Sequence, residues 1–201
     1  MKTEPTYNLE LELKNKGYQY IIGIDEAGRG PLAGPVVAAA VYIPEGFDTA
    51  GINDSKKLSS KNRELFYNKI IRCPHAISEV DEKIIDEINI REATKLVMRN
   101  VIYNMSEADF ALIDGNFIPE MIDIPAQPVI KGDSLSVSIA AASIVAKFWR
   151  DKIMNSYHMR WPAYGFNKNK GYGTKHHREI IKMIGPCSIH RKSFRGVKEY
   201  V

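Results

Sequence analysis

Cysteine is scarce in this sequence, and long apolar runs are absent. Its only two cysteines, Cys73 and Cys187, lie too far apart to match the spacing of metal ligands. We therefore expect reduced thiols and no zinc site. No apolar run approaches the roughly 18 to 20 residues of a membrane span, and residues 1–16 lack the apolar core of a signal peptide. Both absences favour a cytoplasmic protein that does not enter a membrane.

Positive charge is concentrated toward the C-terminal end. Residues 151–201 carry 11 Lys and Arg against 3 Asp and Glu, whereas residues 1–150 carry 17 against 21. A basic segment beside an acidic one suits a polyanionic partner, with the acids kept for metal. Charge alone favours nucleic acid, and a basic surface that only faces water is the alternative. The length of 201 residues is that of one domain.

The segment 23–35 holds the first candidate site. Asp25 and Glu26 follow an apolar run, and the loop after them is rich in glycine. Carboxylates, which bind cations, thus lie beside glycine backbone amides, which bind anions. This combination suits a metal-dependent enzyme that acts on phosphates. The loop also fits a loose dinucleotide-binding pattern, but Pro31 and Pro35 interrupt the helix that such a pattern should open. A plain hairpin with an acid pair on its surface is the other alternative.

Two further acids follow apolar segments that are typical of buried strands. Asp114 ends the run 110–113, and Asp133 comes shortly after the run 127–130. Because sites in open α/β sheets form at strand ends, these acids can converge with the first acid pair. Four carboxylates at one place repel one another unless cations lie among them. The pattern therefore predicts a site for two Mg²⁺ ions.

Apolar spacing and capping residues outline the remaining elements. We expect strands at 35–43 and 75–80, and helices at 61–72, from Asp81 onward, and at 134–155 with Asp133 or Ser134 as cap. Residues 1–17 hold three leucines, too few to predict a stable element. Asp151 lies roughly 27 Å along a helix from Asp133, too far for the same metal ions, so we expect a surface ion pair there.

Loops that combine lysines with aromatic rings are candidates for substrate contact. Lys56 and Lys57 lie in a polar loop before a helix, where they can hold a phosphate or be ordinary surface lysines. The loop 161–174 mixes aromatic residues with lysines and glycines, a combination that stacks on sugars or bases and holds phosphates. We expect Thr174 to cap a helix. Without metal spacing, structural or phosphate-facing roles are expected for His176, His177 and His190.

Seven motifs in a fixed order carry a resemblance to a known family. They are GIDEAGRGP (23–31), DSKKL (54–58), IDG (113–115), KGD (131–133), AAASI (140–144), KGYGT (170–174) and HRKSF (190–194). With them the chain resembles a type 2 ribonuclease H, the ribonuclease HII of bacteria, over about residues 20–194. The resemblance implies an α/β fold with a ribonuclease-H-like core, a mixed β-sheet flanked by helices, and a helical C-terminal part.

The resemblance also implies a domain plan and an activity. It divides the chain into a lead-in at 1–18, a catalytic core at 19–157 and a basic substrate-clamping segment at 158–201, within a single structural unit. The implied enzyme cuts the RNA strand of RNA/DNA hybrids and nicks 5′ of single ribonucleotides embedded in duplex DNA. Two Mg²⁺ or Mn²⁺ ions would serve the hydrolysis, leaving 5′-phosphate and 3′-hydroxyl ends. A monomer without an obligatory protein partner is expected.

The resemblance assigns the site residues as well. Catalysis and metal binding fall to Asp25, Glu26, Asp114 and Asp133. Substrate contacts fall to Gly28, Arg29, Gly30, Lys56, Lys57, Lys170, Tyr172 and Arg191. In the family, the Gly-Arg-Gly loop reads the ribose 2′-hydroxyl, and the tyrosine that matches Tyr172 stacks on the sugar at the junction. Asn169 departs from the pattern, since relatives often have histidine there, and we expect this change to alter a phosphate or hydroxyl contact.

Three other interpretations stay open from the sequence. A junction resolvase of the same fold would use similar acids, but it has no need for the Gly-Arg-Gly loop or for Tyr172. A hybrid-binding protein without activity would bind without magnesium-dependent cutting, and the presence of all four acids argues against it. A nicotinamide-dependent enzyme would gain thermal stability from its cofactor, a shift we do not expect.

Overall fold

A mixed five-stranded sheet forms the centre of the computed structural model, which describes residues 4–56 and 58–201. Its strands are β1 (Ile21–Ala27), β2 (Val36–Tyr42), β3 (His75–Val80), β4 (Phe110–Asp114) and β5 (Ala126–Val129). They lie in the order β3-β2-β1-β4-β5. The β1 strand pairs antiparallel with β2 and parallel with β4. The predicted α/β class and mixed sheet are therefore confirmed.

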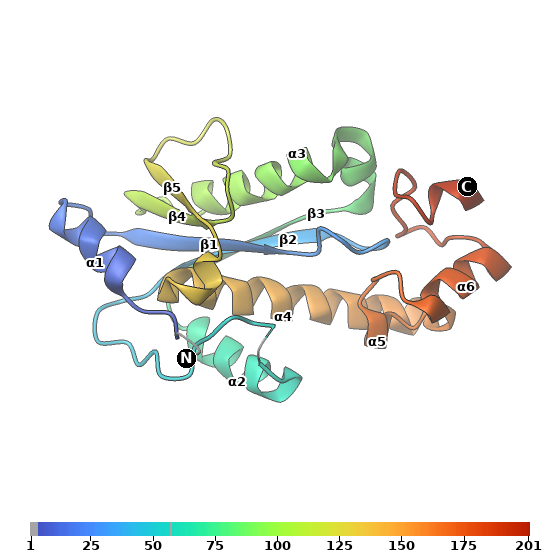
Figure 1. Cartoon of the computed structure of the whole chain (residues 1–201), viewed down its shortest axis with the longest axis horizontal. Helices are drawn as coiled ribbons and strands as arrows, with labels where there is room; N and C mark the ends of the chain where they lie inside the picture. Colours follow the sequence, from blue (N-terminus) through green and yellow to red (C-terminus); the bar gives the residue numbers. More distant parts are fainter. Residues whose placement is uncertain (1–3, 57) are drawn as a thin grey trace.

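Helices cover both faces of the sheet (Figure 1). They are α1 (Asn8–Asn15), α2 (Ser60–Ile70), α3 (Glu82–Tyr103), α4 (Val137–Arg160), α5 (Phe166–Asn169) and α6 (Lys175–Ile184). One face packs on α3 and the other on α4, which gives three layers. In the part of the chain that the structure describes, no helix combines the length and apolar character needed to cross a membrane.

Capping side chains set where these helices begin. As predicted, Asp81 and Thr174 accept hydrogen bonds from the first turns of α3 and α6. The predicted cap of α4 is wrong, because Gly132–Ser134 form a separate 3₁₀ turn. Two residues later, Ser136 accepts a hydrogen bond from Ile139 N at 3.2 Å and starts the helix.

The contact between β1 and α4 depends on Gly23. A Cβ atom on this residue would lie 2.1 Å from the Ser138 carbonyl carbon and 2.2 Å from Ile139 N. Only a residue without a side chain lets the strand come this close to the helix. Together with the small residues 140–142 of α4, which are fully buried, this lets β1 pack closely against α4.

The N-terminal lead-in has more structure than the sequence suggested. The expectation that residues 1–17 contain no stable element is wrong for α1, which packs Leu13 into a cluster with Ile21 and Phe110. Its buried Glu10 accepts hydrogen bonds from both Ser136 Oγ at 2.5 Å and Ser138 Oγ at 2.6 Å. The α1 helix therefore fixes the first turn of α4.

The C-terminal segment forms a small core of its own beyond one end of the sheet (Figure 1). This core contains Tyr164, Phe166 and Ile181, and it includes Leu32 from the glycine-rich loop. The residues 161–174, expected as a loop, contain a 3₁₀ turn and α5. Since α4 runs through the predicted boundary at 157, the core and the C-terminal segment share one helix.

Candidate active site

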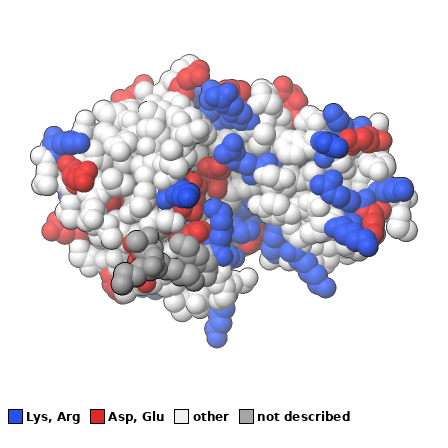
Figure 2. Space-filling view, in the orientation of Figure 1, with Lys and Arg blue, Asp and Glu red and all other residues white. Residues whose placement is uncertain are grey.

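An open pocket of about 280 Å³ lies between the end of β1 and the C-terminal segment. Three of the four predicted catalytic acids line it, namely Asp25, Glu26 and Asp114. Five of the predicted substrate contacts line it too, namely Gly28, Arg29, Gly30, Lys56 and Tyr172. Figure 2 shows acidic side chains in the hollow at the centre of the molecule, with basic side chains on either side. The structure thus brings together most of the predicted site.

Strand pairing explains why acids distant in sequence meet here. In the parallel pair of β1 and β4, Ile24 lies opposite Ile113. The next residue on each strand is an acid, so Asp25 and Asp114 leave the sheet side by side. Glu26 follows on β1, and neighbouring side chains of a strand point to opposite faces. The pocket is therefore lined by carboxylates from two strands.

Burial and mutual repulsion make negative charge unfavourable in the pocket. Burial raises the pKa of Asp25 well above its usual range, and the carboxylates of Glu26 and Asp114 raise it further. Burial also raises the pKa of Glu26, although Arg29 opposes the rise. The pKa of Asp114 is raised by burial and then by the Asp133 carboxylate. Cations that bind here would relieve this cost.

Each acid is held by a nearby donor. Asp25 Oδ1 accepts from Glu26 N at 2.7 Å, and Asp114 Oδ1 accepts from Gly132 N at 2.7 Å. Within residues 4–56 and 58–201, no three His, Cys, Asp or Glu side chains are grouped closely enough to hold a metal ion as they stand. The backbone contacts engage only the Oδ1 atoms, so the Oδ2 atoms of Asp25 and Asp114 are not involved in them.

Asp133 lies beside the pocket rather than on its lining. It is buried, and its Oδ2 atom is 3.4 Å from Lys56 Nζ. Burial lowers the pKa of Lys56, but the carboxylates of Asp133, Asp25 and Asp54 outweigh this effect, so that the pKa is raised overall. Lys56 therefore stays charged beside the Asp133 carboxylate. Lys57, its predicted companion, lies outside the described residues.

Arg191 is fully buried behind the glycine-rich loop. Its guanidinium donates to the carbonyl oxygens of Gly28 at 2.6 Å, Arg29 at 3.0 Å and Gly34 at 2.8 Å. The prediction that Arg191 contacts substrate is thus corrected, because its donors are directed to the backbone. It shapes the loop whose amides face the pocket.

Lys170 and Asn169 also serve the local backbone. Lys170 Nζ donates to Asn167 O at 2.7 Å and borders a different pocket, next to Asp151. Asn169 donates to Tyr164 O at 2.6 Å and accepts from Gly171 N at 2.8 Å. In this chain the departure at Asn169 therefore braces the turn before Tyr172. The predicted ion pair of Asp151 is confirmed, with Lys147 at 2.6 Å.

Several residues on the pocket lining were missed from the sequence. They are Ser55, Ser143, Lys147 and Arg150. Ser143 bonds Ser55 at 2.9 Å and hydrogen-bonds Asp25, which lowers the pKa of that acid slightly against the rise from burial. Three of them could have been grouped from the sequence. Lys147 and Arg150 lie four and seven positions after Ser143, so all three share one face of α4.

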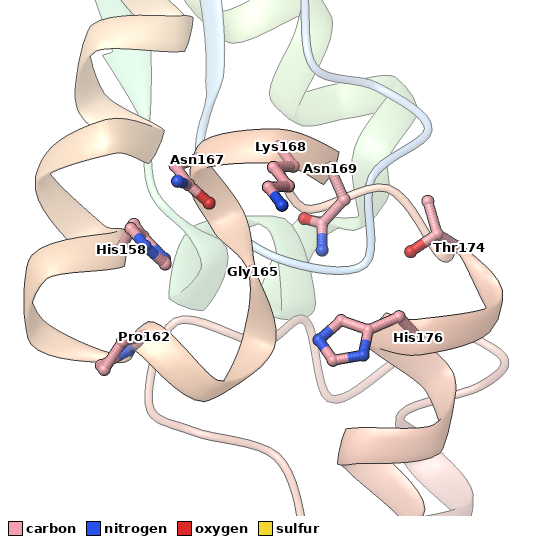
Figure 3. Close-up of a pocket in the computed structure, with 8 residues that line it drawn as sticks. All are labelled: His158, Pro162, Gly165, Asn167, Lys168, Asn169, Thr174 and His176. Atoms are coloured by element: carbon pink, nitrogen blue, oxygen red, sulfur yellow. The ribbon is translucent and has the colours of Figure 1, made fainter.

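A larger pocket of about 720 Å³ lies within the C-terminal segment (Figure 3). Side chains of α4, α5 and α6 surround it, among them His158, Lys168 and His176. Among the described residues, no carboxylate and none of the predicted site residues lines it. Volume alone is therefore a poor guide to the chemistry of this molecule.

The order of the mixed sheet and the acids that leave β1 and β4 define a ribonuclease-H-like nuclease. A solved structure with this fold, the ribonuclease HII of Archaeoglobus fulgidus in a complex with PCNA, superposes with a TM-score of 0.76 and 26% identity, covering 88% of this chain and 96% of that one.

Sequence comparison narrows the class to one family. The ribonuclease HII family model matches residues 22–197. A ribonuclease HII of Chlamydia muridarum is 52% identical over 190 residues, 92% of this chain and 87% of the relative. One from Geotalea uraniireducens is 51% identical, over 96% of this chain and 91% of the relative. The chain belongs to the ribonuclease HII family, and it is a ribonuclease H endonuclease.

Proposed function

We propose that this enzyme cuts the RNA strand of RNA/DNA hybrids and nicks 5′ of single ribonucleotides embedded in duplex DNA. The observation that carries the proposal is the pocket lining. The loop 28–30 and Tyr172 line the same pocket as Asp25 and Asp114. A site that combines acids for metal with groups for a ribose suits cleavage beside a 2′-hydroxyl.

Divalent cations fit the donor set of this pocket. Asp25, Glu26 and Asp114, with Asp133 beside them, offer only carboxylate oxygens, which Mg²⁺ and Mn²⁺ prefer. Burial, and after it the neighbouring carboxylates, raises the pKa values of three of these acids, and bound cations would offset the cost of their negative charge. When bound, two ions would supply an activated water and stabilise the leaving 3′-oxygen, giving 5′-phosphate and 3′-hydroxyl ends.

The chain's own residues position the substrate. Arg191 holds the loop 28–30 so that its amides can bond the ribose, and Tyr172 lies beside Gly30, where its ring can stack on a sugar. Lys56, which projects from the loop before α2, can hold a phosphate when cations take its place among the acids. Selection for RNA then rests on the 2′-hydroxyl, because only this group differs at the sugar.

The basic segment 158–201 would clamp the duplex against the core. This segment has more Lys and Arg than Asp and Glu, and basic side chains lie on its side of the central hollow in Figure 2. Polyanion binding by such a surface is favoured by release of counterions. A monomer that works in the cytoplasm without an obligatory protein partner completes the proposal.

The substitution Tyr172→Ala tests the role of the ring at the junction. Cutting of a duplex with one embedded ribonucleotide should fall about tenfold or more, since stacking on an aromatic ring contributes roughly 1–3 kcal/mol. Cutting inside a long RNA stretch should fall less. Tyr200→Ala, which removes another exposed tyrosine of the C-terminal segment, is the control and should change neither rate. Equal losses on both substrates would refute a junction role.

A further inference from the structure

Two buried histidines of the C-terminal segment form a pair that the proposed chemistry does not use. His177, on α6, and His190 are almost completely buried, and their Nε2 atoms lie 2.9 Å apart. Aromatic rings surround them, with Tyr164 4.8 Å from His190 and Phe166 5.4 Å from His177 between ring centroids. A hydrogen bond in such surroundings must have one donor and one acceptor.

The neighbouring carbonyl fixes the direction of this hydrogen bond. His177 Nδ1 lies 2.9 Å from Tyr172 O, and a carbonyl oxygen can only accept. His177 Nδ1 must therefore carry a proton, which leaves Nε2 of the neutral ring as an acceptor. It follows that His190 Nε2 is the donor between the two rings.

The far end of the pair agrees with this direction. With its proton on Nε2, His190 must accept at Nδ1, and Cys187 N donates to this atom at 2.9 Å. The Cys187 thiol lies 3.2 Å from the same nitrogen, and burial raises the pKa of the thiol to about 11, so it keeps its proton and can also donate. The Cys187 carbonyl, 3.2 Å from the same nitrogen, accepts from His190 N at 3.0 Å and receives no hydrogen bond from the ring in this arrangement.

Both rings must stay uncharged for the chain of hydrogen bonds to hold. A second proton on His177 would place two donors against each other at the shared contact, and a second proton on His190 would set its Nδ1–H against the Cys187 N–H. Burial lowers the pKa of His177, and this effect outweighs the hydrogen bond to Tyr172 O, which raises it. The pKa of His190 is lowered to about 4 by burial and by His177. Neutral rings are thus favoured at physiological pH.

The chain of hydrogen bonds ends at a residue of the candidate site. Tyr172 O accepts from His177 Nδ1 and, at 2.8 Å, from Thr174 N. Tyr172 lines the pocket and is 46% exposed, and a Cβ on Gly30 would be 3.7 Å from its Cε1 atom. The backbone of Tyr172 is therefore anchored to the core of the C-terminal segment, while its ring faces the acids.

We propose that His177 and His190 are positioning residues for Tyr172. They form a one-way chain from Cys187 N–H through His190 and His177 to the Tyr172 carbonyl, with opposite tautomers on the two rings. Their part in cleavage rests on the proposed junction role of Tyr172, whereas the tautomers themselves do not depend on it.

Nitrogen NMR of the wild-type protein tests the chain directly. In a long-range ¹H–¹⁵N correlation spectrum at pH 7, His177 should be the Nδ1–H tautomer and His190 the Nε2–H tautomer. The same tautomer on both rings, or a charged ring at this pH, would overturn the proposal. Because no nuclease activity is needed, this result is independent of the proposed function.

Variants of His177 test the effect on the substrate. His177→Phe keeps a buried ring but removes the donor to Tyr172, and should raise KM for the single-ribonucleotide duplex about fivefold with a smaller change in kcat. His177→Asn, which retains an N–H near the position of Nδ1, should restore part of the loss. His176→Ala, on the exposed side of α6, is the matched control. A folded His177→Phe protein with the wild-type KM would overturn the positioning role.

Discussion

Each of the four predicted acids has a hydrogen-bond or ion-pair partner within the protein. In the structure, Asp25 and Asp114 accept from backbone amides, Glu26 pairs with Arg29 at 3.2 Å, and Asp133 pairs with Lys56 at 3.4 Å. These local bonds hold a cluster of like charges together without an ion. In the proposed function, cations would take over the Glu26 and Asp133 carboxylates, and Arg29 and Lys56 would then be available to phosphates.

Removal of one carboxylate tests this exchange at the residue scale. Asp114→Asn should abolish cutting, at least about a thousandfold, since one metal ligand and one negative charge are lost together. Binding of the hybrid should persist or tighten, because repulsion of phosphate falls. Strand cleavage and gel-shift titration measure the two effects. Asp48→Asn, at an exposed ion pair with Lys69, is the control and should cut normally. A near-normal rate for Asp114→Asn would remove this acid from the site.

The chemistry of single residues is easier to predict from the sequence than their surroundings. Asp25, Glu26 and Asp114 were expected to converge, and they line one pocket. An acid at the end of a buried strand is costly unless it has a partner there, which makes such a position informative. The buried role of Arg191 was not foreseen, since a charge in a sequence does not reveal whether its partners are phosphates or backbone carbonyls. Only the fold brings the carbonyls of Gly28 and Gly34 to that guanidinium.

Among the helices and strands, apolar runs were sufficient to predict the strands, and capping residues were sufficient to predict most helix starts. Asp81 and Thr174 cap the helices that they were expected to cap. The α1 helix was missed because its stability comes from distant partners. Leu13 packs on strand residues, and Glu10 bonds residues 126 and 128 positions later. No local pattern carries that information.

The anchoring of α1 predicts a contrast between two glutamates on the same helix. Glu10→Ala leaves the hydroxyls of Ser136 and Ser138 without their acceptor, and should lower the free energy of unfolding by about 2 kcal/mol. Glu12→Ala, at an exposed position, should change it by less than about 0.5 kcal/mol. Chemical denaturation measures both values. Equal stability of the two variants would show that the buried carboxylate contributes nothing net.

At the scale of the whole molecule, the site is made by topology. The parallel pairing of β1 with β4 places acids from residues 25 and 114 side by side, and α4 then carries the chain from the core into the C-terminal segment. The sequence predicts that strand ends meet. It does not predict how the basic segment folds back, because Leu32 and Ala33 join the core of that segment through contacts far apart in the chain.

The charge of the pocket predicts how metal and pH act on stability. Asp25, Glu26 and Asp114 have higher pKa values when folded, so the folded chain binds more protons, and their contribution to stability falls as pH rises from about 4 through the folded values. Mg²⁺ at 10 mM should raise Tm by about 3 °C at pH 8, and by less at pH 5.

Thermal denaturation at matched ionic strength measures this shift. NaCl in place of MgCl₂ is the control for general screening, and Asp114→Asn should lose most of the Mg²⁺ effect. An equal rise with both salts, or a larger rise at pH 5 than at pH 8, would contradict a metal site among these carboxylates.

In the proposed enzyme, one pocket joins metal-binding acids to residues that recognise the ribose. The most direct test is strand cleavage by the purified protein, with Mg²⁺ or Mn²⁺, on three labelled duplexes: all DNA, DNA with one embedded ribonucleotide, and an RNA/DNA hybrid. We predict a nick 5′ of the lone ribonucleotide, cutting of the RNA strand of the hybrid, and no cutting of all-DNA duplex. Binding of the hybrid without cutting of any duplex under either metal would contradict the claim.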